Sequence, residues 1–157
     1  MGRSRRRPAV ALAVVALIAY WALLPSEEDR IRRRIREAAR ALEEERAAEV
    51  LDLFDPAAIR SAWEFDLEEA RDALEEVLSL CEGIEVDLEK PRIALEKGRQ
   101  RALVTLRFAV TGRCEEQFGF IAGTPGEKAL VRVAMEKDPT HGWRIVGIEQ
   151  ALFPGMI

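Results

Sequence analysis

The sequence predicts an α+β protein in which an N-terminal transmembrane helix is followed by three helices packed on a curved antiparallel sheet. An uncharged, mostly apolar run occupies residues 8–26. Apolar residues then recur at helical spacing as far as Leu78, and from Ile84 onward they alternate in twos. The 157 residues suffice for one ordinary domain with a short extension, and a 48% hydrophobic, 33% charged composition is typical of a globular chain.

The charge balance argues against a nucleic-acid-binding protein. Four of the 24 Lys and Arg residues, and none of the 28 acidic residues, precede Ser26. Residues 27–157 therefore carry 20 basic against 28 acidic side chains, a net charge of −8. Phosphate contacts need a basic face, so we expect no nucleic-acid partner.

The first segment is predicted to be an uncleaved membrane anchor. Residues 1–7 are basic, and the 19 uncharged residues of 8–26 reach about 28 Å as a helix, enough to span a bilayer. A signal peptide is the alternative, but the distal end, "AYWALLP", has bulky residues where a cleavage site has small ones. Tyr20 and Trp21 are typical of residues at a membrane interface.

The orientation of the anchor depends on two competing arginine clusters. Arg3, Arg5, Arg6 and Arg7 abut the apolar run, whereas the cluster at 30–36 is preceded by three acidic residues. We therefore expect the N-terminus inside and the following domain outside the cytoplasmic membrane, in the bacterial envelope.

The helices are marked by their capping residues. Ser26 and Asp29 begin a helix whose apolar stripe includes Ile31 and Ile35 and resumes at Val50. Asp55 followed by Pro56 predicts a short helix over "PAAIRSAW". Asp66 and Glu69 form a second capping box. The helix that they begin has an apolar stripe through Leu67, Ala70, Leu74, Val77, Leu78 and Cys81, and is expected to stop near Gly83.

The strands follow from alternation. Ile84, Val86 and Leu88 share one face of the first strand, and a short strand over "RIALEKG" follows Pro91. A long strand places Ala102, Val104, Leu106, Phe108 and Val110 on one face and Arg101, Thr105, Arg107 and Thr111 on the other. Turns at "TPGE" and "KDPTHG" flank the strand from Ala129 to Met135, and "WRIVGIEQ" is the last strand.

This order of elements, together with "HGWRIVGIEQ", resembles the nuclear transport factor 2-like superfamily, a cone of bent sheet wrapped around helices. In that family the last strand commonly reads Trp-Arg-Ile-Val after a Gly-containing turn, as Trp143 to Val146 do here. The resemblance covers residues 27–150 and is greatest for small bacterial proteins with one N-terminal span. It implies a cone pocket, in which the family's enzymes generally place His, Tyr and Asp as acid, base and oxyanion donors.

The residues of such a catalytic set are scarce in this chain. Tyr20 lies in the apolar run, and His141 lies in a turn with no carboxylate predicted to orient it. No metal-ligand cluster, nucleophile elbow, phosphate loop or dinucleotide fingerprint occurs, so no metal or cofactor is expected. Residues that could line the cone pocket are Asp52, Asp55, Trp63, Phe65, Phe108, Phe118, Phe120 and Trp143, with core packing as the alternative for the aromatic ones.

Two further groups of residues carry predictions. Cys81 and Cys114 both fall on core-facing positions and are either bridged, joining a helix to the sheet, or two separately buried thiols. The open sheet face with Arg101, Leu103, Thr105 and Arg107, and Leu152 and Phe153 of the apolar tail 151–157, are candidate interface residues. The tail is expected either to fold back on the domain or to insert into a partner.

The sequence thus favours a single-pass, membrane-anchored, non-enzymatic interaction or accessory domain of the cell envelope, with a second copy or an envelope protein as partner. The alternative is a binder of a small apolar ligand, or a dehydratase- or isomerase-type enzyme, that uses the cone pocket.

Overall fold

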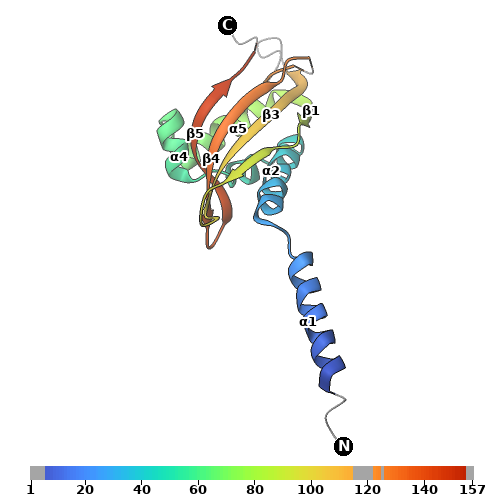
Figure 1. The fold of residues 1–157 in the computed structure, drawn as a ribbon. Coiled ribbons are helices and arrows are strands. Elements are labelled where there is room, and N and C mark those ends of the chain that lie inside the picture. The colour runs from blue at the N-terminus through green and yellow to red at the C-terminus, as the bar shows by residue number, and fades with distance from the viewer. Residues whose placement is uncertain (1–5, 115–121, 125, 155–157) are drawn as a thin grey trace, which may run out of the picture.

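A computed structural model describes residues 6–114, 122–124 and 126–154, and it confirms the α+β prediction (Figure 1). In chain order the elements are α1 (Arg6–Leu23), α2 (Glu27–Glu43), α3 (Ala47–Leu51), α4 (Pro56–Trp63), α5 (Leu67–Ser79), β1 (Cys81–Leu88), β2 (Arg92–Leu95), β3 (Arg101–Cys114), β4 (Ala129–Asp138) and β5 (Gly142–Leu152).

The N-terminal helix α1 stands apart from the rest of the chain. Its 18 residues correspond to about 27 Å of helix, and Figure 1 shows it extending away from the sheet and the other helices. Side chains from Ala11 to Leu24 are exposed. By length and composition this helix could cross a membrane, a test that a signal sequence near the N-terminus also passes.

Helix α2 begins as predicted but ends earlier. The Ser26 hydroxyl caps it by accepting from the Asp29 amide at 3.1 Å. The helix stops at Glu43 because Glu45 adopts a left-handed backbone conformation, with φ of 58°. The later apolar residues of the predicted stripe therefore belong to α3 and the segment after it. Within the described residues, four helices rather than three follow α1.

The first residue of α2 is hydrogen-bonded to the β4–β5 hairpin. The Glu27 carboxylate accepts from Lys137 Nζ and Trp143 Nε1, each at 2.9 Å, and pairs with Arg30 at 3.0 Å. Its side chain is 16% exposed. Burial raises the pKa of Glu27, but the hydrogen bonds from Lys137 and Trp143 and the nearby positive charges outweigh burial and lower the pKa below its ordinary value. We call this contact the Glu27 latch.

Helices α4 and α5 start at the predicted caps, and α5 ends before its predicted end. Asp55 accepts from the Ala57 amide, and Asp66 and Glu69 form the reciprocal capping box. Helix α5 stops at Ser79, and Cys81 begins β1 instead of completing a helical stripe. The strand starts there because Cys81 pairs with Cys114 of β3.

The sheet is antiparallel, with strand order β1-β3-β4-β5 and β2 paired to β3 beyond the end of β1. Helices α2 and α5 lie on one side of it (Figure 1). The predicted alternation of β3 holds from Ala102 to Leu106, since Ala102, Val104 and Leu106 are buried in one core with Ile31, Val133 and Met135. Beyond Leu106 it breaks, because Phe108 is half-buried and the adjacent Ala109 and Val110 are both buried. Strand β5 continues to Leu152, so the first two residues of the expected tail are part of the sheet. Pro125 of the "TPGE" turn lies outside the described residues.

A disulfide joins Cys81 to Cys114. Of the two alternatives the bridged one holds, but it connects two neighbouring strands rather than a helix to the sheet. Cys81 lies in a small apolar cluster with Ala47, Leu78 and Val110. The bridge therefore fixes the edge strand β1 to β3, and α5 contacts this region through the packing of Leu78.

Candidate functional site

An apolar cavity of about 280 Å³ lies between the helices and the sheet. We call it the cone cavity. Its wall includes Ile35, Ala39 and Leu42 of α2 and Leu106, Val131 and Val133 of the sheet. These residues surround one space because α2 and the strands direct their apolar faces toward each other.

The wall of the cone cavity carries almost no polar side-chain atoms that could take part in catalysis. All eighteen lining residues that the structure describes are Ala, Val, Leu, Ile, Phe or Trp. Apart from the indole N–H of Trp63, no side chain among them carries a polar atom. General acid–base catalysis and covalent catalysis both need a polar group within reach of the substrate. The described wall can exclude water and hold hydrocarbon, and it supplies no acid, base or nucleophile.

Three exposed residues mark where the cone cavity reaches the surface. Trp63, Ile148 and Phe153 line it and are 45%, 38% and 38% exposed. Trp63 ends α4 and packs edge-on against Phe54, with ring centroids 5.8 Å apart. Phe153 follows β5, whose end lies opposite α1 in Figure 1. The mouth of the cavity thus lies away from the N-terminal helix.

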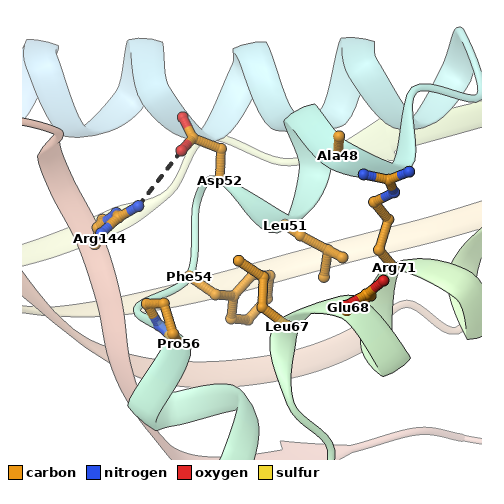
Figure 2. Close-up of a pocket in the computed structure, with 9 residues that line it drawn as sticks. All are labelled: Ala48, Leu51, Asp52, Phe54, Pro56, Leu67, Glu68, Arg71 and Arg144. Atoms are coloured by element: carbon orange, nitrogen blue, oxygen red, sulfur yellow. Dashed lines mark hydrogen bonds and ion pairs between the residues drawn. The ribbon is translucent and has the colours of Figure 1, made fainter.

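A second hollow, of about 400 Å³, lies between α3, α4, α5 and β5. We call it the charged pocket. Figure 2 shows an apolar floor with charged side chains at its sides. The floor is formed by Leu51, Phe54, Pro56 and Leu67, and the charged residues are Asp52, Glu68, Arg71 and Arg144.

Asp52 is brought to this pocket by a short strand-like contact. The Ile145 amide donates to the Leu53 carbonyl, and the Asp55 amide donates to the Ile145 carbonyl, both at 2.8 Å. These bonds hold the chain after α3 alongside β5. Asp52 consequently lies next to Arg144, the residue before Ile145 on β5.

Asp52 is paired mainly with Arg34 of α2. Arg34 Nη2 lies 2.7 Å from Asp52 Oδ2 and also donates to the Asp52 carbonyl at 2.8 Å, whereas Arg144 Nη2 is 3.5 Å from Oδ1. The hydrogen bond from Arg34 and the charges of both arginines lower the pKa of Asp52 below its ordinary value, although burial opposes them. Asp52 is therefore an ionised partner of arginine and not a proton donor near neutral pH.

Phe54 lines both hollows. Its ring belongs to the floor of the charged pocket in Figure 2 and also packs on Trp63 at the cone cavity. The two hollows are therefore neighbours that share one wall.

The predicted pocket residues are placed in several surroundings. Trp63 and Phe108 line the cone cavity, and Asp52 lines the charged pocket. Asp55 caps α4, Phe65 is 44% exposed between α4 and α5, and Trp143 is 3% exposed and bonded to Glu27. Phe118 and Phe120 lie outside the described residues.

Most of the predicted interface residues lie on the sheet, whereas one lies in the wall of the cone cavity. Arg101 pairs with Glu136 at 3.0 Å across β3 and β4, Arg107 is exposed, and Leu103 and Thr105 are half-buried. Leu152 is 53% exposed. Phe153 instead lies in the wall of the cone cavity, so this part of the tail folds back on the domain.

His141 has an orienting carboxylate that the sequence analysis did not predict. Its Nδ1 lies 3.2 Å from Asp138 Oδ1 within the turn between β4 and β5. The backbone amides of His141 and Thr140 also donate to Asp138 and lower the pKa of that carboxyl. The pair is exposed and lines neither the cone cavity nor the charged pocket.

Five residues of these contacts are not marked by the sequence pattern: Arg34, Arg71, Arg144, Glu68 and Glu27. Arg34 is one of several arginines in an Arg-rich helix, and Arg144 is part of the Trp-Arg-Ile-Val stretch, so neither stood out. The one available signal was the Arg-rich run at 30–36 in an otherwise acidic domain, and it points only to Arg34. Among the described residues, no group of three or more His, Cys, Asp or Glu side chains is placed to hold a metal ion.

No protein-family model and no curated protein sequence matches the chain. Its fold does match solved structures. A protein from Novosphingobium aromaticivorans described as nuclear transport factor 2-like with a cystatin-like fold aligns over 99% of this chain and 94% of its own, with 16% identity and a TM-score of 0.59. A nuclear transport factor 2-like superfamily protein from Salmonella enterica serovar Typhimurium covers 82% and 91%, with 14% identity and a TM-score of 0.60.

A proposed aromatic ring hydroxylase from Novosphingobium aromaticivorans is also similar. It aligns over 82% of this chain and 89% of its own length, at 13% identity and a TM-score of 0.61. At these identities the matches establish a common fold and leave the activity of this chain open.

Proposed function

We propose that this chain, which has the nuclear transport factor 2-like fold, is a single-pass membrane protein. Its domain, residues 27–150, acts outside the cytoplasmic membrane. The domain binds an apolar group rather than catalysing a reaction. The observation that carries the proposal is the cone cavity, whose described wall is built of hydrocarbon side chains. The apolar group belongs to a small molecule or to an envelope protein for which this domain is an accessory.

The chemistry of the wall favours an uncharged occupant. A buried charge or an unpaired polar group costs several kcal/mol where the wall offers no partner, whereas each Å² of apolar surface removed from water contributes about 25 cal/mol. The exposed rim of Trp63, Ile148 and Phe153 extends the same apolar character to the surface. This supports binding of aliphatic or aromatic groups.

The membrane location is supported by α1 and by the disulfide. The helix has the length of a bilayer span, exposed apolar side chains, and Tyr20 and Trp21 near its end. Disulfides such as Cys81–Cys114 persist in oxidising compartments outside the cytoplasm. The helix supports a single span, and the disulfide supports a domain outside the cytoplasmic membrane.

An enzyme of the dehydratase or isomerase type is less well supported. Some structures with this fold are described as proposed dehydratases or hydroxylases. Such reactions need polar groups at the substrate, and the described wall of the cone cavity presents only the Trp63 indole. Measurable turnover that disappears in a cavity-filling variant would overturn the binding proposal.

Native mass spectrometry of the full-length protein, extracted gently from its own membrane, tests the proposal. We expect a mass that retains Met1 or begins at Gly2, with a bound small molecule or a co-purifying protein. A chain that begins after the apolar run would overturn the anchor.

A matched pair of variants locates the bound group. Ala39→Leu adds volume inside the cone cavity, whereas Ala62→Leu makes the same change at an exposed position of α4. Binding should be lost in the first variant and kept in the second. Equal retention in both would show that the bound group does not occupy the cavity.

A further inference from the structure

We propose that the charged pocket is a second binding site, for a short zwitterion with an apolar middle, such as a free dipeptide of apolar residues. The proposal concerns a different hollow from the cone cavity and does not depend on what the cone cavity binds.

Two of the charged groups are already matched by close partners. Asp52 is paired with Arg34 at 2.7 Å, and Arg71 Nε is paired with Glu75 Oε1 at 3.0 Å. These pairs neutralise one acid and one base of the pocket. They leave the largely buried Arg144 and the exposed Glu68 without a close partner among the described residues.

Arg144 is a largely buried cation with little to bind. Its side chain is 14% exposed, and its one ion pair within the described residues is the 3.5 Å contact with Asp52, at the limit of a hydrogen bond. Its Nε is buried without a hydrogen-bond partner in the same residues. A guanidinium has five N–H donors and suits a carboxylate in particular, so Arg144 can accept a carboxylate ligand.

Glu68 is the matching anion on the other side. It is an exposed residue in the first turn of α5, free to reach a ligand, and makes no ion pair or side-chain hydrogen bond with the residues that the structure describes. Figure 2 shows Glu68 and Arg144 on opposite sides of the floor formed by Leu51, Phe54 and Leu67. A ligand that matches both has an ammonium at one end and a carboxylate at the other.

The floor and the volume define the middle of the ligand. The apolar side chains between the two charges can contact hydrocarbon but cannot pair with further polar groups. The pocket, at about 400 Å³, is in the range of small-molecule sites. Dianions such as phosphate are disfavoured because Asp52 and Glu68 face the same space. A free dipeptide with two apolar side chains meets each of these conditions.

Calorimetric titration of the full-length protein in nanodiscs tests the proposal with three probes. These are Leu-Leu with free termini, Leu-Leu amide, which lacks the carboxylate, and N-acetyl-Leu-Leu, which lacks the ammonium. We expect saturable binding of Leu-Leu and about tenfold weaker binding of each capped form, because each loses one charge-assisted hydrogen bond. No saturable binding, or equal binding of all three, would overturn the proposal.

Two variants assign each end of the ligand. Arg144→Gln should weaken Leu-Leu about tenfold and leave Leu-Leu amide unchanged, and Glu68→Gln should weaken Leu-Leu and leave N-acetyl-Leu-Leu unchanged. Arg60→Gln and Glu76→Gln, at exposed positions of α4 and α5, are the matched controls and should change nothing. Binding that depends on Arg144 but not on Glu68 would overturn the zwitterion assignment.

Folding and the cone cavity are controlled separately. If Arg144→Gln lowers the unfolding temperature, Arg144→Lys keeps a positive charge there and should restore part of the affinity for Leu-Leu. Ala39→Leu fills the cone cavity and should leave dipeptide binding unchanged. Loss of dipeptide binding in Ala39→Leu would instead assign the probe to the cone cavity and would contradict the proposed second binding site.

Discussion

The cone cavity and the charged pocket share Phe54 but differ in how their walls are made. The wall of the cone cavity comes from residues that recur along α2 and the strands, each directed inward by its own element. The charged pocket is lined by residues of α3, α4, α5 and β5, and its ion pairs join Asp52, which follows α3, to Arg34 of α2 and Arg144 of β5. One hollow is thus a product of local periodicity, and the other is a product of tertiary contact.

This difference predicts different responses to change. Apolar walls contain nothing that titrates, so the cone cavity should be insensitive to pH and salt and sensitive to loss of packing. The charged pocket should respond to both pH and salt, because its arginines and carboxylates are partly exposed. Three predictions test this contrast, from the largest expected effect to the smallest.

Removal of the disulfide should have the largest effect on the free energy of unfolding, and it should loosen the strands that line the cone cavity. The bridge closes a sequence separation of 33 residues, for which the loop-entropy relation gives about 3.5 to 4 kcal/mol of stabilisation. Urea unfolding of C81A/C114A should show a loss of this size. Hydrogen exchange should increase first in β1 and β3, where Val86 and Val110 line the cone cavity.

The reduced wild-type protein is the control for the volume lost in the double variant. It should be destabilised to a similar extent. A double variant as stable as the oxidised wild type would contradict the stapling role of the bridge.

Asp52→Ala should have an intermediate effect, confined to the charged pocket. Arg34 and Arg144, which are 22% and 14% exposed, would both lose their carboxylate partner. We expect a loss of about 1 to 2 kcal/mol in the free energy of unfolding, since a largely buried donor would be left without an acceptor. Chemical denaturation measures the loss, and Asp72→Ala on the exposed face of α5 should change the stability by less.

Acidification should produce the smallest effect attributable to a single pocket residue. The pKa of Asp52 is lowered in the folded protein, chiefly by the hydrogen bond from Arg34, so its contribution is fully present above its ordinary value of 3.8. The contribution is lost as the pH falls through the lower folded pKa. Because Asp52 is 49% exposed, we expect less than about 1 kcal/mol.

The measurement compares wild type and Asp52→Asn between pH 6 and pH 3. The stability difference between the two should shrink as the pH falls below about 4. Ala39→Leu, which changes the cone cavity, should keep a constant difference from wild type over the same range. A constant difference for Asp52→Asn would contradict the assigned ion pair.

Much of the cone could be predicted from the sequence because each residue's face follows from its own strand or helix. Ala102, Val104 and Leu106 were assigned to one face of β3 and are buried together. The break after Glu43 was not predicted, since the apolar stripe continues on both sides and no Gly or Pro marks it. The left-handed backbone at Glu45 makes the break, and a non-glycine residue gives little warning of that conformation.

The charged pocket could not be predicted in the same way. Asp52 was predicted as a residue that could line the cone pocket, but its partners Arg34 and Arg144 are 18 and 92 residues away in the chain. Nothing in local spacing links them. The backbone hydrogen bonds of Ile145 with Leu53 and Asp55 bring Asp52 next to Arg144. No side-chain pattern in the sequence predicts such backbone contacts.

The Glu27 latch determines how mechanical load passes through the molecule. Three residues, Leu24 to Ser26, separate α1 from α2, a tether of about 10 Å at full extension. Because Glu27 is bonded to Lys137 and Trp143, a pull on α1 is borne by the first turn of α2 and the β4–β5 hairpin together. Ile35, Ala39 and Leu42 of the same helix line the cone cavity, so a displacement of the N-terminal helix would reach the wall of that cavity through α2.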